Sequence, residues 1–108
     1  MNRALLDQCL DMFIAAPKIW DQRGYIRDTP NGVEYCLAGL AVALSGKAVK
    51  SNKYWIVEGH AQFHDTAQKL LDITDEQAED IFGYTPWLEG WTAERFKQYV
   101  YQKLEIND

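Results

Sequence analysis

At 108 residues the chain has the length of one domain, and its 47% apolar and 25% charged residues are typical of a globular protein. A net charge of −5 argues against the binding of a nucleic-acid backbone, which usually takes a basic surface. Lys47, Lys50 and Lys53 form a small basic cluster, which we interpret as a solvated loop. No apolar run is long enough to span a membrane, and no secretory signal pattern is present. We therefore expect one helical domain over residues 1–108, located in the cytoplasm.

The first half of the chain predicts two helices joined by a connector. An amphipathic helix over about 2–16 ends before Pro17, since the residue before a proline is pushed out of helical geometry. A connector over 18–31 follows, and we expect Trp20 to anchor it on the core. Residues 33–45 are apolar on nearly every face, so they predict a central helix that is covered on all sides. Gly46 would end this helix in a left-handed conformation.

The second half predicts one short extended segment and three more helices. Residues 54–57 are aromatic and β-branched, as strands are, and a partner at 25–26 would give a minimal two-stranded ribbon. A helix is expected over about 60–72, and a short helix follows the N-cap Thr74, with a capping box at 74–77. The last helix starts after a cap at residue 92. The fold class is thus all-α: a compact five-helix bundle around the central helix, to which the ribbon could be added.

Three fragments stand in a recognisable order: Pro17…Trp20-Asp21-Gln22, then Tyr35-Cys36-Leu37-Ala38-Gly39, then Leu70-Leu71-Asp72-Ile73-Thr74 with Gln77-Ala78. Together they resemble a family of small uncharacterised proteins of actinobacteria and especially their phages, whose patterns include W-x-Q, C-x-A-G and L-L-G-L-T-x-x-Q-A. The resemblance covers roughly residues 10–83, and it departs from the pattern at Lys18, Leu40 and 72–73. It implies a phage or mobile-element origin and action on a host protein, such as a defence or regulatory system, and it adds no chemistry.

A cysteine-dependent hydrolase centred on Cys36 is the runner-up function. A thiol near the start of a helix can have a lowered pKa, and Gln22 with His60 or His64 could serve as the upstream and downstream partners. However, Cys36 lies in an apolar run, and burial raises the pKa of a thiol. We therefore favour buried free thiols at Cys36 and Cys9, in a reducing compartment.

Neither a metal nor a cofactor is expected. His60 and His64 are four residues apart on a predicted helix, so both could face one ion. The zinc-protease pattern requires Glu directly after the first His, and this chain has Ala61 there. We interpret both histidines as ordinary surface or half-buried residues. A small-molecule-binding sponge stays as a third alternative, because Trp-rich bundles can hold planar ligands.

Two sets of residues are candidates for partner binding. An acidic face is predicted at the junction of two helices, formed by Asp72, Asp75, Glu76, Glu79 and Asp80. It would attract a basic partner, although it is also typical of a solvated surface. An aromatic surface is predicted near the C-terminus, formed by Tyr84, Trp87, Trp91, Tyr99 and Tyr101, where Tyr101 is expected to be exposed. The favoured function is a non-catalytic protein-interaction module, with a homodimer as an alternative use of the aromatic surface.

Overall fold

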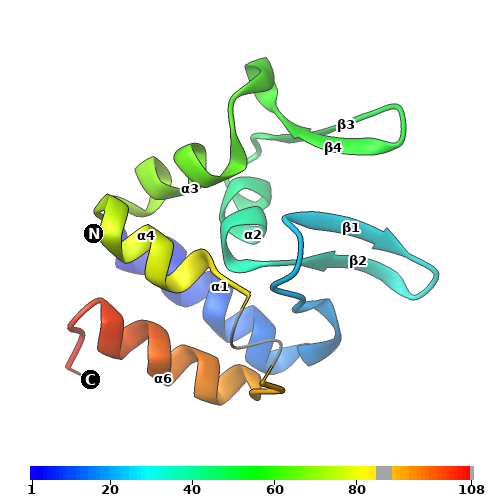
Figure 1. Cartoon of the computed structure of the whole chain (residues 1–108). Helices are drawn as coiled ribbons and strands as arrows, with labels where there is room; N and C mark the ends of the chain where they lie inside the picture. Colours follow the sequence, from blue (N-terminus) through cyan, green and yellow to red (C-terminus); the bar gives the residue numbers. More distant parts are fainter. Residues whose placement is uncertain (85–88, 108) are drawn as a thin grey trace.

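The computed structural model describes residues 1–84 and 89–107, and this part of the chain contains both helices and strands (Figure 1). The prediction of an all-α fold is wrong, because the described residues form five α-helices and two antiparallel two-stranded sheets, a mixed α/β fold. The helices are α1 (Arg3–Ala15), α2 (Leu37–Leu44), α3 (Phe63–Leu71), α4 (Asp75–Phe82) and α6 (Ala93–Lys103). The strands are β1 (Ile26–Thr29), β2 (Gly32–Tyr35), β3 (Ala48–Ser51) and β4 (Tyr54–Val57), with 3₁₀ turns at Pro17–Ile19 and Glu58–His60.

Helix α2 is the buried centre of the fold, as the sequence predicted, although it is shorter than expected. Residues 37–42 are all buried, and α2 packs against α1, α3 and α4. The predicted start at residue 33 is wrong, because Val33 lies in β2 and the helix begins only after Cys36. The predicted end is confirmed: Gly46 follows the helix with a left-handed φ of 73°.

Gly39 allows the chain that enters β1 to lie directly on α2. A Cβ atom at this position would lie 1.8 Å from the carbonyl oxygen of Tyr25. The same oxygen accepts the backbone N–H of Cys36 at 3.1 Å, so the first turn of α2 is joined to the first hairpin through the backbone. A side chain at residue 39 would push the hairpin away from the helix, and this explains the glycine in the Cys-x-Ala-Gly sequence.

The other described helices surround α2 and close an apolar core. Leu10 and Phe13 of α1 and Phe96 and Val100 of α6 are almost fully buried. The ring of Trp20 stacks on Phe96, with 4.8 Å between ring centroids, and its centroid lies 6.2 Å from that of Phe13. The expected role of Trp20 as the anchor of the connector is therefore confirmed.

Helix α4 begins as its sequence predicted. The hydroxyl of Thr74 accepts the backbone N–H of Gln77 at 3.1 Å, and the amide oxygen of Gln77 accepts the backbone N–H of Thr74 at 2.9 Å. This reciprocal capping box satisfies two donors that the helix itself leaves unpaired. In the part of the chain that the structure describes, no helix combines the length and apolar character that crossing a membrane requires.

Two β-hairpins project from one end of the helical body, the second above the first (Figure 1). Strand β1 pairs with β2 and β3 pairs with β4, each through a two-residue loop, at 30–31 and 52–53. Residues 54–57 form the predicted strand, but the predicted pairing with 25–26 is wrong, because their partner is 48–51. A tight loop brings adjacent segments together at the lowest loss of chain entropy, so the nearest segment becomes the partner.

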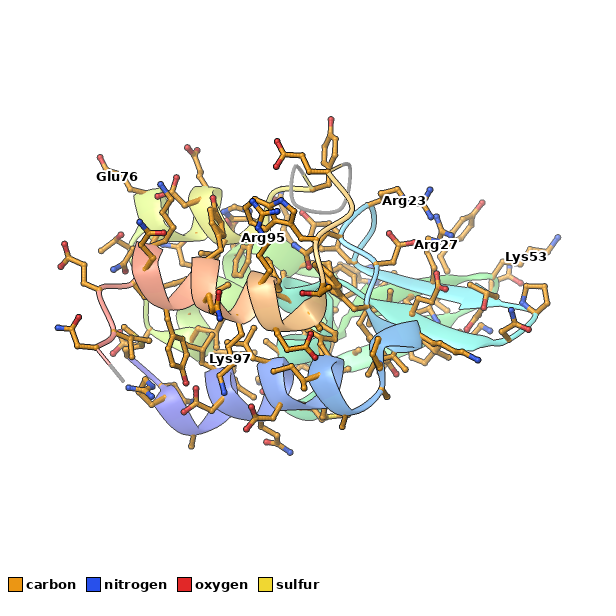
Figure 2. All side chains as sticks on the ribbon, turned by 90° about the horizontal axis from the view of Figure 1, so that it is seen from below. Arg23, Arg27, Lys53, Glu76, Arg95 and Lys97 are labelled. Atoms are coloured by element: carbon orange, nitrogen blue, oxygen red, sulfur yellow. The ribbon has the colours of Figure 1, made fainter. Side chains whose placement is uncertain are left out.

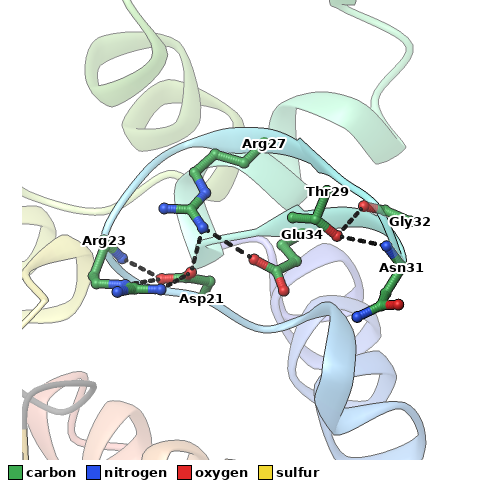
Figure 3. Close-up of polar contacts among 7 residues, drawn as sticks. All are labelled: Asp21, Arg23, Arg27, Thr29, Asn31, Gly32 and Glu34. Atoms are coloured by element: carbon green, nitrogen blue, oxygen red, sulfur yellow. Dashed lines mark hydrogen bonds and ion pairs between the residues drawn. The ribbon is translucent and has the colours of Figure 1, made fainter.

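The tip of the first hairpin is the turn that the sequence predicted at 29–32. The hydroxyl of Thr29 accepts the backbone N–H of Asn31 at 3.2 Å and donates to the carbonyl of Gly32 at 2.7 Å (Figure 3). The bond from Asn31 satisfies a backbone donor that the two-residue loop leaves without a strand partner.

Candidate functional site

Cys36 is a buried thiol that caps α2. It is 2% exposed, and its Sγ accepts the backbone N–H of Gly39 at 3.3 Å. Burial raises the pKa of Cys36 to about 11, although hydrogen bonds from the backbone at the start of α2 act in the opposite direction. Because the thiolate is the nucleophilic form, these surroundings disfavour attack by Cys36.

Gln22 lies close to Cys36, as the hydrolase hypothesis required, but its amide is engaged in structural bonds. Its Oε1 accepts the indole N–H of Trp20 at 3.0 Å and the backbone N–H of Leu37 at 2.8 Å. Its Nε2 donates to the carbonyl of Gly83 at 3.0 Å. With these bonds made, the amide has no donor directed at a substrate beside the thiol. A hollow of about 200 Å³ reaches both Gln22 and Cys36, and neither histidine lines it.

The two histidines do not share a helix face, contrary to the sequence analysis. Helix α3 begins at Phe63, so the predicted start near residue 60 is wrong, and His60 lies in a preceding turn with a left-handed φ of 61°. The ring of His64 instead meets Phe82 edge-on, with 5.2 Å between centroids. Among residues 1–84 and 89–107, no group of three or more His, Cys, Asp or Glu side chains is placed to hold a metal ion.

Asp21 is a buried carboxylate that the sequence analysis missed. Its oxygens lie 2.8 Å from Nη2 of Arg23 and 3.5 Å from Nη2 of Arg27, and Arg27 lies 3.6 Å from Glu34 (Figure 3). The side-chain hydrogen bonds from Arg23 are the main cause that holds the pKa of Asp21 below its usual value. The cluster joins the connector to both strands of the first hairpin, which is a structural role.

The predicted acidic face is exposed on α4 and at the turn before it. All five of its carboxylates are exposed, and Glu76 points outward from the helical body (Figure 2). Asp72 lies 3.0 Å from the N-terminal amine, and Asp75 accepts a hydrogen bond from Gln68 at 2.6 Å. Part of this face therefore contributes to contacts within the chain.

The predicted aromatic surface is largely engaged in packing α6 onto its neighbours. Trp91 meets Tyr99 edge-on at 5.2 Å, and the hydroxyl of Tyr99 donates to the carbonyl of Asp80 on α4 at 2.9 Å. Tyr101, which was expected to be exposed, is half-buried, and its hydroxyl donates to Asp7 on α1. Tyr84 is 56% exposed. The remaining member, Trp87, lies outside the described residues.

A groove runs between the two hairpins, and the sequence analysis did not foresee it. One wall is formed by residues 26–30 and the other by 53–55, around a volume of about 540 Å³; we call it the hairpin groove. The carboxylate of Asp28 accepts hydrogen bonds from the ammonium of Lys50 and, at 3.2 Å, from the indole N–H of Trp55. These bonds join the first hairpin to the second. The hydrogen bond from Lys50 is also the main cause that lowers the pKa of Asp28.

Trp55 also lines a second hollow, of about 330 Å³, where β4 approaches the start of α3. We call it the aromatic pocket, and its ring-bearing residues are Tyr25, Trp55, His60 and Phe63. The rings of Tyr25 and Phe63 stack with 4.9 Å between centroids and 11° between planes. Tyr25 is nonetheless 42% exposed, so part of this apolar surface faces solvent.

The hairpin region differs in charge from the rest of the protein. Residues 16–58 contain six basic and four acidic side chains, whereas the remaining residues contain five basic and twelve acidic ones. The basic residues Arg23, Arg27 and Lys53 extend along the hairpins, whereas Glu76 lies at the opposite end of the molecule (Figure 2). A charge separation of this kind orients an approaching partner before contact.

Comparisons of the chain with models of known protein families, with curated proteins and with solved structures find no match. The assignment of a function therefore depends on the geometry of the described residues.

Proposed function

We propose that the protein is a non-catalytic protein-interaction module and that the two hairpins form its binding surface. The observation that carries this proposal is the concentration of exposed apolar side chains on the hairpins. Five large hydrophobic residues of the described chain are exposed, and three of them, Tyr25 (42%), Val49 (41%) and Tyr54 (73%), lie on or beside the hairpin strands. Tyrosine is enriched in protein interfaces, where a rigid ring contributes contact area at low cost in entropy.

The surroundings of Cys36 offer the hydrolase alternative no support, since the thiol is buried, its pKa is raised and neither His60 nor His64 lines the hollow beside it. The sponge alternative has the aromatic pocket as its best site. That pocket is at the lower end of the volumes usual for ligand sites, and Tyr25 and Phe63 already stack on each other within it. The hairpins therefore favour a macromolecular partner.

The kind of partner that we propose rests on the resemblance of the sequence to actinobacterial and phage proteins. We propose that the protein is encoded by a phage or mobile element and binds a host protein, such as a component of a defence or regulatory system. Cys9 and Cys36 are free and buried, which supports a reducing compartment, the host cytoplasm.

The experiment is a pull-down of the tagged protein from bacterial lysate, read by mass spectrometry, at low and high salt. Wild type is compared with Tyr54→Ala and with Tyr84→Ala, an exposed tyrosine outside the hairpin strands and the hairpin groove that serves as a matched control. We expect one partner at near-stoichiometric yield, with a yield at least about fivefold lower for Tyr54→Ala and unchanged for Tyr84→Ala.

A third variant, Glu76→Lys with Glu79→Lys, tests the acidic face. Capture that is lost in this variant and retained in Tyr54→Ala would move the binding surface to the acidic face and overturn the hairpin assignment. If wild type captures no partner at either salt concentration, the interaction module itself is wrong.

A further inference from the structure

We propose that the hairpin groove accepts an extended segment of the partner as an added β-strand between β1 and β4. This inference rests on the proposed function and specifies its binding mode. The added strand would hydrogen-bond to both hairpins and convert two two-stranded sheets into one five-stranded sheet. Strand addition of this kind takes affinity from main-chain hydrogen bonds and specificity from pockets for alternate side chains.

The register of the first hairpin leaves one edge of β1 unpaired. In an antiparallel pair, alternate residues direct both N–H and C=O either toward the partner strand or away from it. The N–H of Cys36 donates to the carbonyl of Tyr25, which fixes that pair as hydrogen-bonded. Because bonded and non-bonded pairs alternate along the register, Ile26 and Asp28 direct their backbone N–H and C=O groups away from β2.

The second hairpin leaves an equivalent edge on β4. The N–H of Glu58 donates to the carbonyl of Lys47 at 2.7 Å, which fixes the alternation there. Trp55 and Val57 therefore direct their backbone groups away from β3. Within residues 1–84 and 89–107, no other backbone group pairs with the outer edge of either β1 or β4.

The two unpaired edges lie on opposite sides of the hairpin groove. Strands β4 and β1 are the adjacent strands of the two hairpins, with the groove between them (Figure 1). The bonds from Lys50 and Trp55 to Asp28 join the two hairpins through side chains, and within the described residues no backbone hydrogen bond joins β1 to β4. An extended backbone is the ligand that offers donors and acceptors to both edges at once.

The walls of the groove also indicate which segment would fit. Strands of four residues pair with about four to six residues of a partner, at about 3.3 Å per residue. One end of the segment would reach the aromatic pocket, where Tyr25, Trp55 and Phe63 suit an apolar or aromatic side chain. The other end would lie near Lys53, which is exposed at the tip and suits an acidic side chain.

A pair of substitutions at Asp28 separates the backbone contribution from the side chain. Asp28→Ala and Asp28→Pro both remove the carboxylate, but only proline removes the N–H that faces the groove. Proline is tolerated on edge strands at positions whose N–H lies outside the ladder, so both variants should fold, which circular dichroism and thermal melting would verify.

The probe is a library of random eight-residue peptides displayed on phage and selected on the full chain. Selected peptides are synthesised, and their affinities are measured by fluorescence anisotropy. We expect a peptide to bind Asp28→Pro about fivefold more weakly than Asp28→Ala, the worth of about one hydrogen bond. N-methylation of the peptide should weaken binding at either set of alternate residues, because consecutive N–H groups of an inserted strand point to β1 and to β4 in turn. Amide protons of Ile26, Asp28, Trp55 and Val57 should become protected from exchange.

Selected peptides that bind equally to both Asp28 variants, or that tolerate N-methylation at either set of alternate residues, overturn the insertion of a strand between β1 and β4. A library that yields no binder dependent on the hairpins overturns it as well. In either case, the proposed function is retained if the pull-down still captures a partner protein and this capture depends on Tyr54. The free protein could also form a dimer in solution that is lost in Asp28→Pro and retained in Asp28→Ala. That result would show that a second copy of the chain occupies the groove, and it would overturn the assignment of the groove to a segment of another protein.

Discussion

The side-chain oxygen of Gln22 accepts the backbone N–H of Leu37 at 2.8 Å, so a residue of the connector caps the first turn of α2. The same amide bonds to Trp20 and to the carbonyl of Gly83, and thereby joins the connector, α2 and the end of α4. The indole of Trp20, the amide of Gln22 and the backbone N–H of Leu37 thus belong to one buried hydrogen-bond network. Its role is to assemble the elements that hold the hairpins.

Replacement of Gln22 by alanine should lower the free energy of unfolding by about 2–4 kcal/mol, because the buried N–H groups of Trp20 and Leu37 lose their acceptor. The measurement is urea unfolding followed by tryptophan fluorescence. Gln8 is exposed on α1, and Gln8→Ala should change stability by less than about 0.5 kcal/mol. Equal effects of the two substitutions would show that the network is not important for stability.

Replacement of Gly39 by alanine should destabilise the protein by about 3 kcal/mol or more, although alanine favours helices by about 1 kcal/mol over glycine. The reason is the 1.8 Å separation between the added Cβ and the carbonyl oxygen of Tyr25, a backbone atom that cannot rotate away. Thermal unfolding of Gly39→Ala and Gly83→Ala measures the effect. At Gly83 the nearest atom would be 3.7 Å away, so that variant should melt close to wild type.

Local signals were enough to predict α4 and the turn at 29–32. Thr74 and Gln77 stand at the spacing of a capping box, and such bonds need no information from distant residues. The boundary between β2 and α2 was missed because the half-buried strand leads directly into the buried helix, and the mostly apolar sequence from Val33 onward has no glycine or proline between them. The predicted helix therefore included residues 33–35, which belong to β2, and this error contributed to the all-α prediction.

The hairpin groove could not be predicted from the sequence. Asp28 lies 22 residues from Lys50 and 27 from Trp55, and their contact depends on how two separate hairpins are placed on the helical body. The basic cluster that contains Lys50 was visible, but as an isolated run it is indistinguishable from a solvated loop. Burial of Asp21 was equally hidden, because a carboxylate beside an arginine is common on surfaces.

The stability that Asp21 contributes should depend on pH. Its pKa in the folded protein is lowered, mainly by hydrogen bonds from Arg23, so the folded state binds a proton less readily than the unfolded chain does. The contribution is fully present above the unfolded pKa of 3.8 and is lost as the pH falls through the lower folded value. The difference in unfolding free energy between wild type and Asp21→Asn should therefore be largest near about pH 7 and shrink below about pH 4.

Urea titrations of both proteins at a series of pH values measure this difference. Arg23 is the main cause of the lowered pKa of Asp21, so the pH dependence of this difference should weaken when Arg23 is replaced by Met. The four proteins that combine Arg23→Met and Asp21→Asn form a double-mutant cycle. A difference that stays constant throughout the acid range would mean that Asp21 titrates as it does in the unfolded chain.

Both thiols should be unreactive in the folded protein. Burial raises the pKa of Cys36 to about 11 and that of Cys9 to about 12, and only the thiolate reacts with Ellman's reagent. At about pH 8 the native protein should react at least roughly 100-fold more slowly than the urea-unfolded chain, because the thiolate is scarce and the reagent has no access. The variant Cys9→Ala assigns any remaining signal to Cys36. Rapid reaction of native Cys36 with an apparent pKa below about 7 would restore the cysteine-hydrolase hypothesis and weigh against a purely structural thiol.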